Sequence, residues 1–156
     1  MKILLHLLYV FGLAILAFCV GCTGRTMLSV NAAGFSDASL AGGYSVALTG
    51  ETLGTGSFKF AEVDVITFDG FGRLSGHGTM NDGGRICASA ITGTYNVNTD
   101  GSGLAMLFQT PDAASATGGC TTINFQLALA ISDAGAEVQF VELASSEVAS
   151  GIARRQ

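Results

Sequence analysis

The sequence predicts an all-β protein, an eight-stranded antiparallel up-and-down β-barrel, with a two-sheet β-sandwich as the alternative. An Asp-containing turn recurs at spacings of 31 and 33 residues, at Asp69-Gly70-Phe71-Gly72, Asp100-Gly101-Ser102-Gly103 and Asp133-Ala134-Gly135. Asp-Gly between alternating apolar stretches predicts a hairpin, because both residues tolerate a positive φ. The composition agrees, since 22 Gly, one Pro and 12% charged residues favour many short strands joined by tight turns.

Period-two alternation between these turns predicts eight strands. They cover, in order, residues 44–49, 58–68, 73–80, 85–97, 103–109, 123–131, 138–143 and 147–155. The first places Tyr44, Val46 and Leu48 on one face, and Gly76 and Gly78 suit a sharp bend in the third. Eight sequential antiparallel strands can close into a barrel without free edges. Side chains fill the interior of such a barrel or leave room for one small ligand.

Residues 1–21 predict a signal peptide, because a short basic start precedes an apolar run that extends to Val20. The exit, Gly21-Cys22, resembles a bacterial lipobox, in which the cysteine is lipidated and becomes the first residue. Cys19 departs from that motif, which usually has Leu there. We therefore expect an exported cell-envelope lipoprotein whose membrane contact is a lipid anchor at Cys22. Two alternatives stay open: cleavage after Ala32, which gives a secreted soluble protein, and an uncleaved anchor.

The rest of the chain divides into a flexible tether, residues 22–39, and a barrel domain, residues 40–156. Without Lys2, six Lys and Arg residues stand against twelve Asp and Glu residues, which gives a net charge of −6. An acidic surface repels nucleic acid, and the basic residues cluster only at Arg154-Arg155. Nucleic-acid binding is therefore not expected.

Four phrases of the sequence carry a family resemblance: Leu40-Ala41-Gly42-Gly43-Tyr44, Thr67-Phe68-Asp69-Gly70-Phe71-Gly72, Gly93-Thr94-Tyr95-Asn96-Val97-Asn98 and Ala149-Ser150-Gly151-Ile152-Ala153. They resemble turns and strand ends of uncharacterised exported bacterial β-barrel domains, which are similar to the allene oxide cyclase and dirigent barrels. The resemblance covers residues 40–156 and implies a lipocalin-like barrel architecture. No catalytic residue of those enzymes falls on a matching motif, so the resemblance implies no catalytic residue here.

Cys87 and Cys120 are the two cysteines of the predicted barrel, and an even pair in an exported domain predicts a disulfide. Two free thiols, or one reactive thiol, are the alternatives. His77 is the one histidine outside the signal peptide, and we expect it to face solvent. One histidine cannot complete a zinc site beside paired cysteines, and one Asp in each turn is too few for calcium. The sequence therefore assigns no catalytic, cofactor-binding or metal-binding residue.

Glu62 and Asp64 are the sharpest polar candidates, because they alternate in phase with the aromatic and aliphatic residues of the second predicted strand. If that face points inward, burial raises their pKa values and one of them can act as a general acid or base. We favour the other interpretation, in which a bulge or register shift leaves both carboxylates outside, with Val63 and Val65 inside. Glu142 poses the same question on the seventh strand.

Three functions fit a barrel of this kind. A binding module for a small apolar ligand predicts a cavity of at least a few hundred Å³. A structural or interaction domain predicts a filled core. An isomerase or cyclase of the barrel type that the chain resembles predicts Glu62 or Asp64 in a pocket with a shifted pKa, and it ranks behind the other two. The candidate barrel-lining residues are Tyr44, Glu62, Asp64, Tyr95, Phe125 and Phe140.

Overall fold

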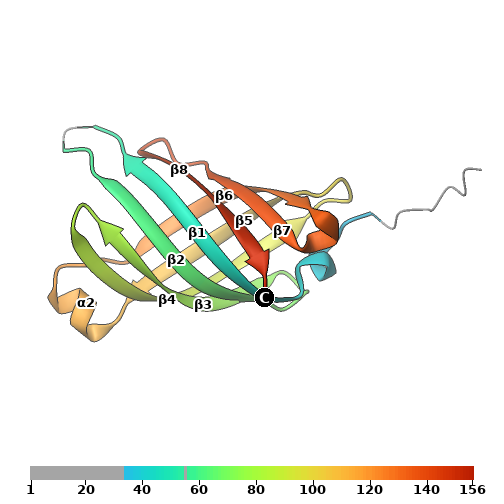
Figure 1. Ribbon diagram of the computed structural model, residues 1–156, viewed down its shortest axis with the longest axis horizontal. Coiled ribbons are helices and arrows are strands. Elements are labelled where there is room, and N and C mark those ends of the chain that lie inside the picture. Colours follow the sequence, from blue (N-terminus) through green and yellow to red (C-terminus); the bar gives the residue numbers. More distant parts are fainter. Residues whose placement is uncertain (1–33, 55) are drawn as a thin grey trace, which may run out of the picture. The chain divides into compact units, whose positions relative to one another are not determined.

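Eight antiparallel strands close into a barrel in the computed structural model, which describes residues 34–54 and 56–156 (Figure 1). The strands are β1 (Gly42–Thr52), β2 (Lys59–Phe68), β3 (Arg73–Asp82), β4 (Arg85–Val97), β5 (Ser102–Pro111), β6 (Ile123–Ser132), β7 (Glu137–Glu142) and β8 (Glu147–Arg155). Each strand pairs with the next, and β8 returns to β1. The barrel prediction is confirmed, and the sandwich alternative is wrong. The predicted signal peptide, the lipidation at Cys22 and the cleavage at Ala32 lie outside the described residues.

Alternation of buried and exposed side chains builds the barrel wall. In β2 the even-numbered residues are buried and the odd-numbered ones are exposed along the whole strand. β5 alternates in the same way from residue 102 to residue 110, but there the odd-numbered residues are the buried ones. Inward aliphatic and aromatic residues such as Ile66 and Phe125 fill the lumen, and burying each stabilises the fold by ~1.5–3 kcal/mol. Gly76 of β3 lies opposite Ile66 of β2. A Cβ at Gly76 would lie 2.2 Å from the Val65 carbonyl oxygen, so only glycine fits at this position.

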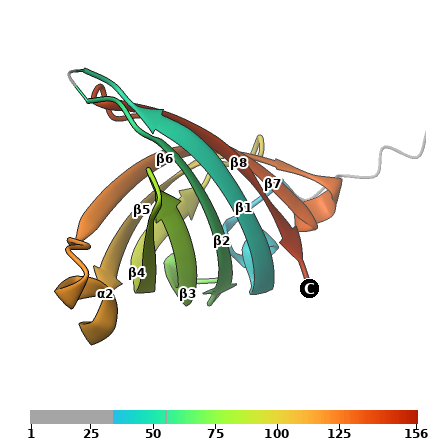
Figure 2. The same ribbon diagram turned by 60° about the vertical axis from the view of Figure 1, so that its left-hand side comes forward.

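The two ends of the barrel are built differently. The β2–β3, β4–β5 and β6–β7 turns lie at the end that also holds a 3-10 helix, η1 (Asp37–Leu40), and we call it the closed end (Figure 1). The opposite end carries the β1–β2 hairpin and a short helix, α2 (Ala113–Thr117), and we call it the α2 end (Figure 2). The sequence predicts only a loop where α2 forms. None of the helices in residues 34–54 and 56–156 is long and apolar enough to cross a membrane.

Aromatic side chains fill the lumen at the closed end. The Phe68 ring packs edge-on between Tyr44 and Tyr95, with centroid distances of 5.2 and 5.0 Å. The Tyr44 hydroxyl donates to the Gly135 carbonyl and accepts from Arg155 Nη2 at 2.9 Å. The Tyr95 hydroxyl accepts at 2.9 Å from an amide of the β2–β3 turn and donates at 3.2 Å to a carbonyl of η1. Each of the two hydroxyls therefore donates one hydrogen bond and accepts at least one.

The segment just before β1 belongs to the folded barrel unit. Leu40 is fully buried, and the Asp37 carboxylate accepts a hydrogen bond of 2.7 Å from the Val97 amide of β4. The Phe35 amide donates at 3.1 Å to a carbonyl of the β4–β5 turn. Residues 35–39, which the sequence assigns to the tether, are therefore part of the folded unit. Hydrogen bonds to backbone groups of the barrel hold this segment in place. Such bonds leave no apolar pattern in the sequence, so the sequence does not indicate that the segment is folded.

The recurring Asp residues stabilise turns, as the hairpin interpretation requires. Asp69 Oδ1 accepts hydrogen bonds of 2.9 and 2.7 Å from the amides of Arg73 and Phe71, and these bonds lower the pKa of Asp69. Asp100 accepts an equivalent amide hydrogen bond in the second turn. The third turn is a short 3-10 segment, η2 (Asp133–Gly135). The Asp carboxylates of the first two turns thus hold the chain's own amides.

A disulfide joins Cys87 of β4 to Cys120, with the two Cα atoms 5.9 Å apart. The predicted pairing is confirmed, and the free-thiol alternatives are wrong. Close to this bond, the Ala88 amide donates to Ser115 Oγ of α2 at 2.9 Å. The disulfide closes a separation of 33 residues. In the chain-entropy model, a crosslink of that span stabilises the fold by ~3–4 kcal/mol.

Candidate functional site

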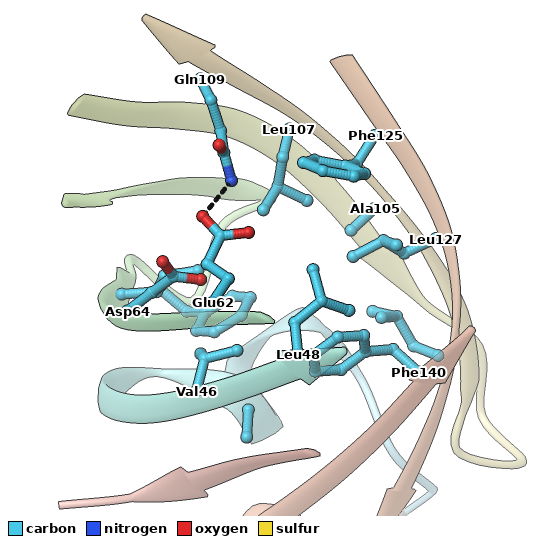
Figure 3. Close-up of a pocket in the computed structure, with 14 residues that line it drawn as sticks. Val46, Leu48, Glu62, Asp64, Ala105, Leu107, Gln109, Phe125, Leu127 and Phe140 are labelled. Atoms are coloured by element: carbon cyan, nitrogen blue, oxygen red, sulfur yellow. Dashed lines mark hydrogen bonds between the residues drawn. The ribbon is translucent and has the colours of Figure 1, made fainter. Parts of the chain in front are cut away.

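Three polar side chains lie inside the barrel, and we call them the lumen cluster: Glu62 and Asp64 of β2 and Gln109 of β5 (Figure 3). These residues are only 3%, 7% and 2% exposed, in that order. Carboxylates are seldom buried so completely unless they are paired or have a function. The lumen cluster is therefore the strongest candidate for a functional site.

The interpretation that left Glu62 and Asp64 outside the barrel is wrong. Val63 and Val65 are the exposed residues, at 64% and 39%. The pairing of β2 with β1 runs in continuous register over Lys59–Phe68, so no bulge reverses the alternation. The large aromatic residues near both ends of β2 take inner positions, and the two carboxylates between them follow in phase.

One hydrogen bond links the cluster across the lumen. Gln109 Nε2 donates to Glu62 Oε1 at 2.5 Å, the dashed line in Figure 3. Three other oxygens, Glu62 Oε2, Asp64 Oδ1 and Gln109 Oε1, are buried without a hydrogen-bond partner among the described residues. Leaving a buried polar group unpaired costs ~1–3 kcal/mol. The described part of the chain therefore does not satisfy this cluster by itself.

Gly78 of β3 provides the space that Asp64 occupies. The two residues lie directly opposite each other in the β2–β3 pairing. A Cβ at Gly78 would lie 1.7 Å from Asp64 Oδ1, far inside any tolerated contact. The missing side chain at Gly78 thus makes room for a carboxyl group inside the barrel.

Burial controls the protonation of the two carboxyl groups. Burial, together with the neighbouring Glu62 carboxylate, raises the pKa of Asp64 to about 8. Burial also raises the pKa of Glu62, and the polar neighbours Asp64 and Gln109 offset part of that increase. Two like charges in a poorly solvated site disfavour double ionisation, so both shifts favour protonation of the pair. The cluster thus combines two carboxyl groups and a carboxamide.

The lumen beside the cluster is almost filled. A cavity of about 30 Å³ remains there. Its other walls are apolar side chains, among them Leu48, Leu107 and Leu127. Pockets for small organic ligands usually measure ~300–1,000 Å³. The ligand-binding hypothesis predicts a cavity of at least a few hundred Å³. The described residues leave no cavity of that size in the lumen.

The candidate barrel-lining residues divide into two groups. Glu62, Asp64, Phe125 and Phe140 line the lumen cavity. Tyr44 and Tyr95 are buried as well, but they pack at the closed end, where their hydroxyls are hydrogen-bonded to backbone groups.

Sequence reasoning missed Gln109. The signal was its phase, because Gln109 continues the alternation of Ala105 and Leu107 along β5, both of which are buried. A polar residue at an inward position of an otherwise apolar alternation indicates a partner inside the barrel. That partner, Glu62, lies on a strand that does not pair with β5, so only the closed fold brings the two together.

Glu142, buried near the α2 end of β7, has a structural role. Its Oε1 atom accepts hydrogen bonds from the amides of Gln126 and Ala144, at 3.1 and 3.3 Å, where β7 ends. Glu142 Oε2 has no partner among residues 34–54 and 56–156. Glu142 is not among the residues that line the lumen cavity. It therefore stabilises the backbone and stands apart from the lumen cluster.

The described part of the chain contains no group of three His, Cys, Asp or Glu side chains that could hold a metal ion. His77 is exposed on β3, as the sequence predicts. Its neighbours in the β2–β3–β4 sheet are Val65 and Ala90, neither of which can ligate a metal through its side chain.

Comparison of the chain with protein-family models, with curated proteins and with solved structures gives no match. The similarity to exported bacterial barrels and to the allene oxide cyclase and dirigent barrels therefore stays a prediction. The features of the molecule that bear on its function are the barrel, its nearly filled lumen and the lumen cluster.

Proposed function

We propose that this chain is an exported module of the cell envelope, anchored by lipid at Cys22, whose barrel serves as a structural or interaction domain with a filled interior. The observation that supports this function is the lumen cavity of about 30 Å³. Benzene-sized molecules occupy apolar cavities of ~150 Å³. Because the remaining cavity is this small, we favour a barrel that acts through its outer surface and its ends over one that carries a molecule inside.

Two features support export and anchoring. The Cys87–Cys120 disulfide is a bond that persists in oxidising compartments and is rare in the cytosol. The basic and apolar start of the chain, followed by Gly21-Cys22, has the pattern of a lipoprotein signal. Membrane attachment then comes from acyl chains on Cys22, and the barrel extends into the envelope compartment.

Native mass spectrometry tests the filled interior. We expect the protein purified from a bacterial envelope to have the mass of the processed, lipidated chain with one disulfide, and no further mass that leaves on denaturation. A reproducible extra mass that is released on denaturation would contradict the filled interior and identify a bound ligand by its weight.

A Cys22→Ser variant tests the anchor. Fractionation and the mass of the amino-terminal peptide are the readouts. We expect wild-type protein in the membrane fraction with acyl chains on Cys22, and the variant without acylation and released from that fraction. An unmodified Cys22 in the mature wild-type protein, or an amino terminus at Ala33, would overturn the lipid anchor.

A second candidate function is acid–base catalysis of the isomerase or cyclase type. The specific observation in its favour is the pair Glu62 and Asp64, buried in the lumen with raised pKa values. This function requires the lumen to admit a substrate. Titration with benzene, followed by NMR of the inward methyl groups, separates the two candidates. A filled barrel gives no shift at Leu107 or Leu127, whereas saturable shifts there would show that the lumen admits a small molecule, as catalysis requires.

A further inference from the structure

We propose that the lumen cluster is a binding site for buried water. One or two water molecules occupy the lumen cavity, form hydrogen bonds with Glu62 Oε2, Asp64 Oδ1 and Gln109 Oε1, and stabilise a single proton shared by the two carboxyl groups. The site goes beyond the proposed function, which requires only that no larger molecule occupies the lumen.

The chemistry of the unpaired atoms determines the class of ligand. Gln109 Oε1 is a hydrogen-bond acceptor, and so is whichever of Glu62 Oε2 and Asp64 Oδ1 does not carry the shared proton; no N–H group of the described residues reaches these three atoms. Buried polar groups without a protein partner are usually paired with ordered water. A ligand for this site must therefore both donate and accept hydrogen bonds, as water does.

The size of the cavity limits the ligand to one or two heavy atoms. The lumen cavity measures about 30 Å³, and a single water needs ~10–15 Å³ on this scale. Apolar cavities of proteins stay dry, but a cavity with two to four polar partners binds water. Three unpaired oxygens in an otherwise apolar cavity meet that condition, because Glu62, Asp64 and Gln109 all line it.

The surroundings of the two carboxyl groups explain the shared proton. The residues opposite Glu62 and Asp64 on β1 are Leu48 and Val46, and those on β3 are Met80 and Gly78. The lining contributed by β5, β6, β7 and β8 adds Gln109 and apolar residues, but no ionisable group. No cation therefore faces the pair from the lining, and a proton is the remaining way to remove one of two buried negative charges.

Magnetic relaxation dispersion of ¹⁷O-labelled water tests the water site, because it counts water molecules that stay bound for longer than the protein tumbles. We expect the purified wild-type protein to hold at least one more long-lived water than the triple variant Glu62→Met/Asp64→Leu/Gln109→Met. The matched control is Glu142→Gln, which keeps a side-chain oxygen to accept from the Gln126 and Ala144 amides and lies outside the cavity, and it should keep the wild-type count. Equal counts in wild type and triple variant would overturn the proposal.

Ammonium is the other donor of this size, and the same measurement distinguishes it. If water is the ligand, replacing sodium chloride by ammonium chloride leaves the count unchanged. Loss of the long-lived water in ammonium chloride would show that the site prefers the cation and would overturn its assignment to water.

Infrared spectroscopy tests the shared proton without requiring the triple variant to fold. In D₂O at neutral pH, the wild-type protein should show the carbonyl stretch of a protonated carboxyl group. The isosteric double variant Glu62→Gln/Asp64→Asn should lose that band, and Glu142→Gln should keep it. A wild-type spectrum without the band would mean that both carboxyl groups are ionised, and the proposal would fail.

Discussion

The closed end and the lumen cluster are both buried and both contain polar groups, yet only the closed end is satisfied by its own chain. At the closed end, the Tyr44 hydroxyl is bonded to Gly135 and Arg155, and the Tyr95 hydroxyl to two backbone groups. In the lumen cluster, one hydrogen bond joins Gln109 to Glu62, and three buried oxygens have no partner in the described chain.

The hydrogen-bonded hydroxyls of the closed end stabilise the fold, whereas the unpaired oxygens of the lumen cluster lower its stability. A satisfied network adds rigidity, and breaking it leaves unpaired groups behind. An unsatisfied cluster lowers stability, and replacing its charged members relieves part of that cost. Substitutions in the two regions should therefore have opposite signs.

Tyr44→Ala should have the largest effect. It removes a fully buried aromatic ring and leaves the Gly135 carbonyl without its donor, so we expect the free energy of unfolding to fall by ~3–5 kcal/mol. Urea denaturation measures this change. Tyr44→Phe, which removes only the hydroxyl, is the matched control, and it should cost ~1–3 kcal/mol. If Tyr44→Phe were neutral, the hydroxyl network would not stabilise the closed end.

The lumen cluster should make the protein less stable as the pH rises. Burial, together with the neighbouring Glu62 carboxylate, raises the pKa of Asp64 from its ordinary value of 3.8 to about 8. The contribution of Asp64 to the free energy of unfolding is therefore fully present below the pKa of Asp64 in the unfolded chain. It is lost as the pH increases through 8, with a slope of at most ~1.4 kcal/mol per pH unit for one proton. Unfolding measured between pH 4 and pH 9 gives this slope.

Asp64→Asn removes the titrating group in this experiment, and we expect a shallower slope and a variant more stable than wild type at pH 9. Glu142→Gln should keep the wild-type slope. The turn carboxylates, such as Asp69, have lowered pKa values and act in the opposite sense at low pH, but they are common to all three proteins. A wild-type slope in Asp64→Asn would show that Asp64 does not titrate as a buried group.

Gly78→Ala should cost ~1–3 kcal/mol, because its Cβ would overlap Asp64 Oδ1 and force that carboxyl group to move. In an Asp64→Ala background, the same substitution should cost less, because the overlapping atom is gone. Thermal unfolding of the four proteins in this double-mutant cycle measures the coupling. Additive effects would mean that Gly78 does not make room for Asp64.

Val63→Thr should have the smallest effect, within ~0.5 kcal/mol, because Val63 is exposed on the outer wall. Ile66→Ala, three residues further along β2, points inward and should cost ~2–5 kcal/mol. Urea denaturation of both variants checks which face of β2 is the inner one. A large cost for Val63→Thr would show that Val63 faces the lumen. Glu62 and Asp64 would then face outward, and the lumen cluster would not exist.

The strands and the order in which they pair could be predicted, because turn residues and period-two alternation are local signals. The Asp69 and Asp100 turns form as their sequence indicates, and the Cys87–Cys120 disulfide follows from counting cysteines in a domain that the sequence predicts to be exported. Closure of the barrel follows from eight sequential antiparallel strands.

The orientation of β2 could not be predicted, because both of its faces are partly apolar. Val63 and Val65 suit an interior as well as Ile66 does, and carboxylates argue against the face that carries them. Only the continuous pairing with β1 and the space at Gly78 decide it.

The cavity depends on how side chains from distant strands fill a common volume. Phe125 of β6 and Phe140 of β7 suit a filled lumen and a hollow one equally well, and the sequence alone does not give the space between them. The bond between Glu62 and Gln109 likewise joins strands that are not neighbours.

A high-resolution crystal structure of the protein purified from a bacterial envelope at neutral pH tests the central claim most directly. The claim is that the lumen is filled by the chain and by water at the lumen cluster. We predict isolated water-sized density within hydrogen-bonding distance of Glu62 and Asp64, and side chains everywhere else in the lumen. Continuous density of an organic molecule between Phe125 and Phe140 would contradict the claim and make the barrel a carrier or an enzyme.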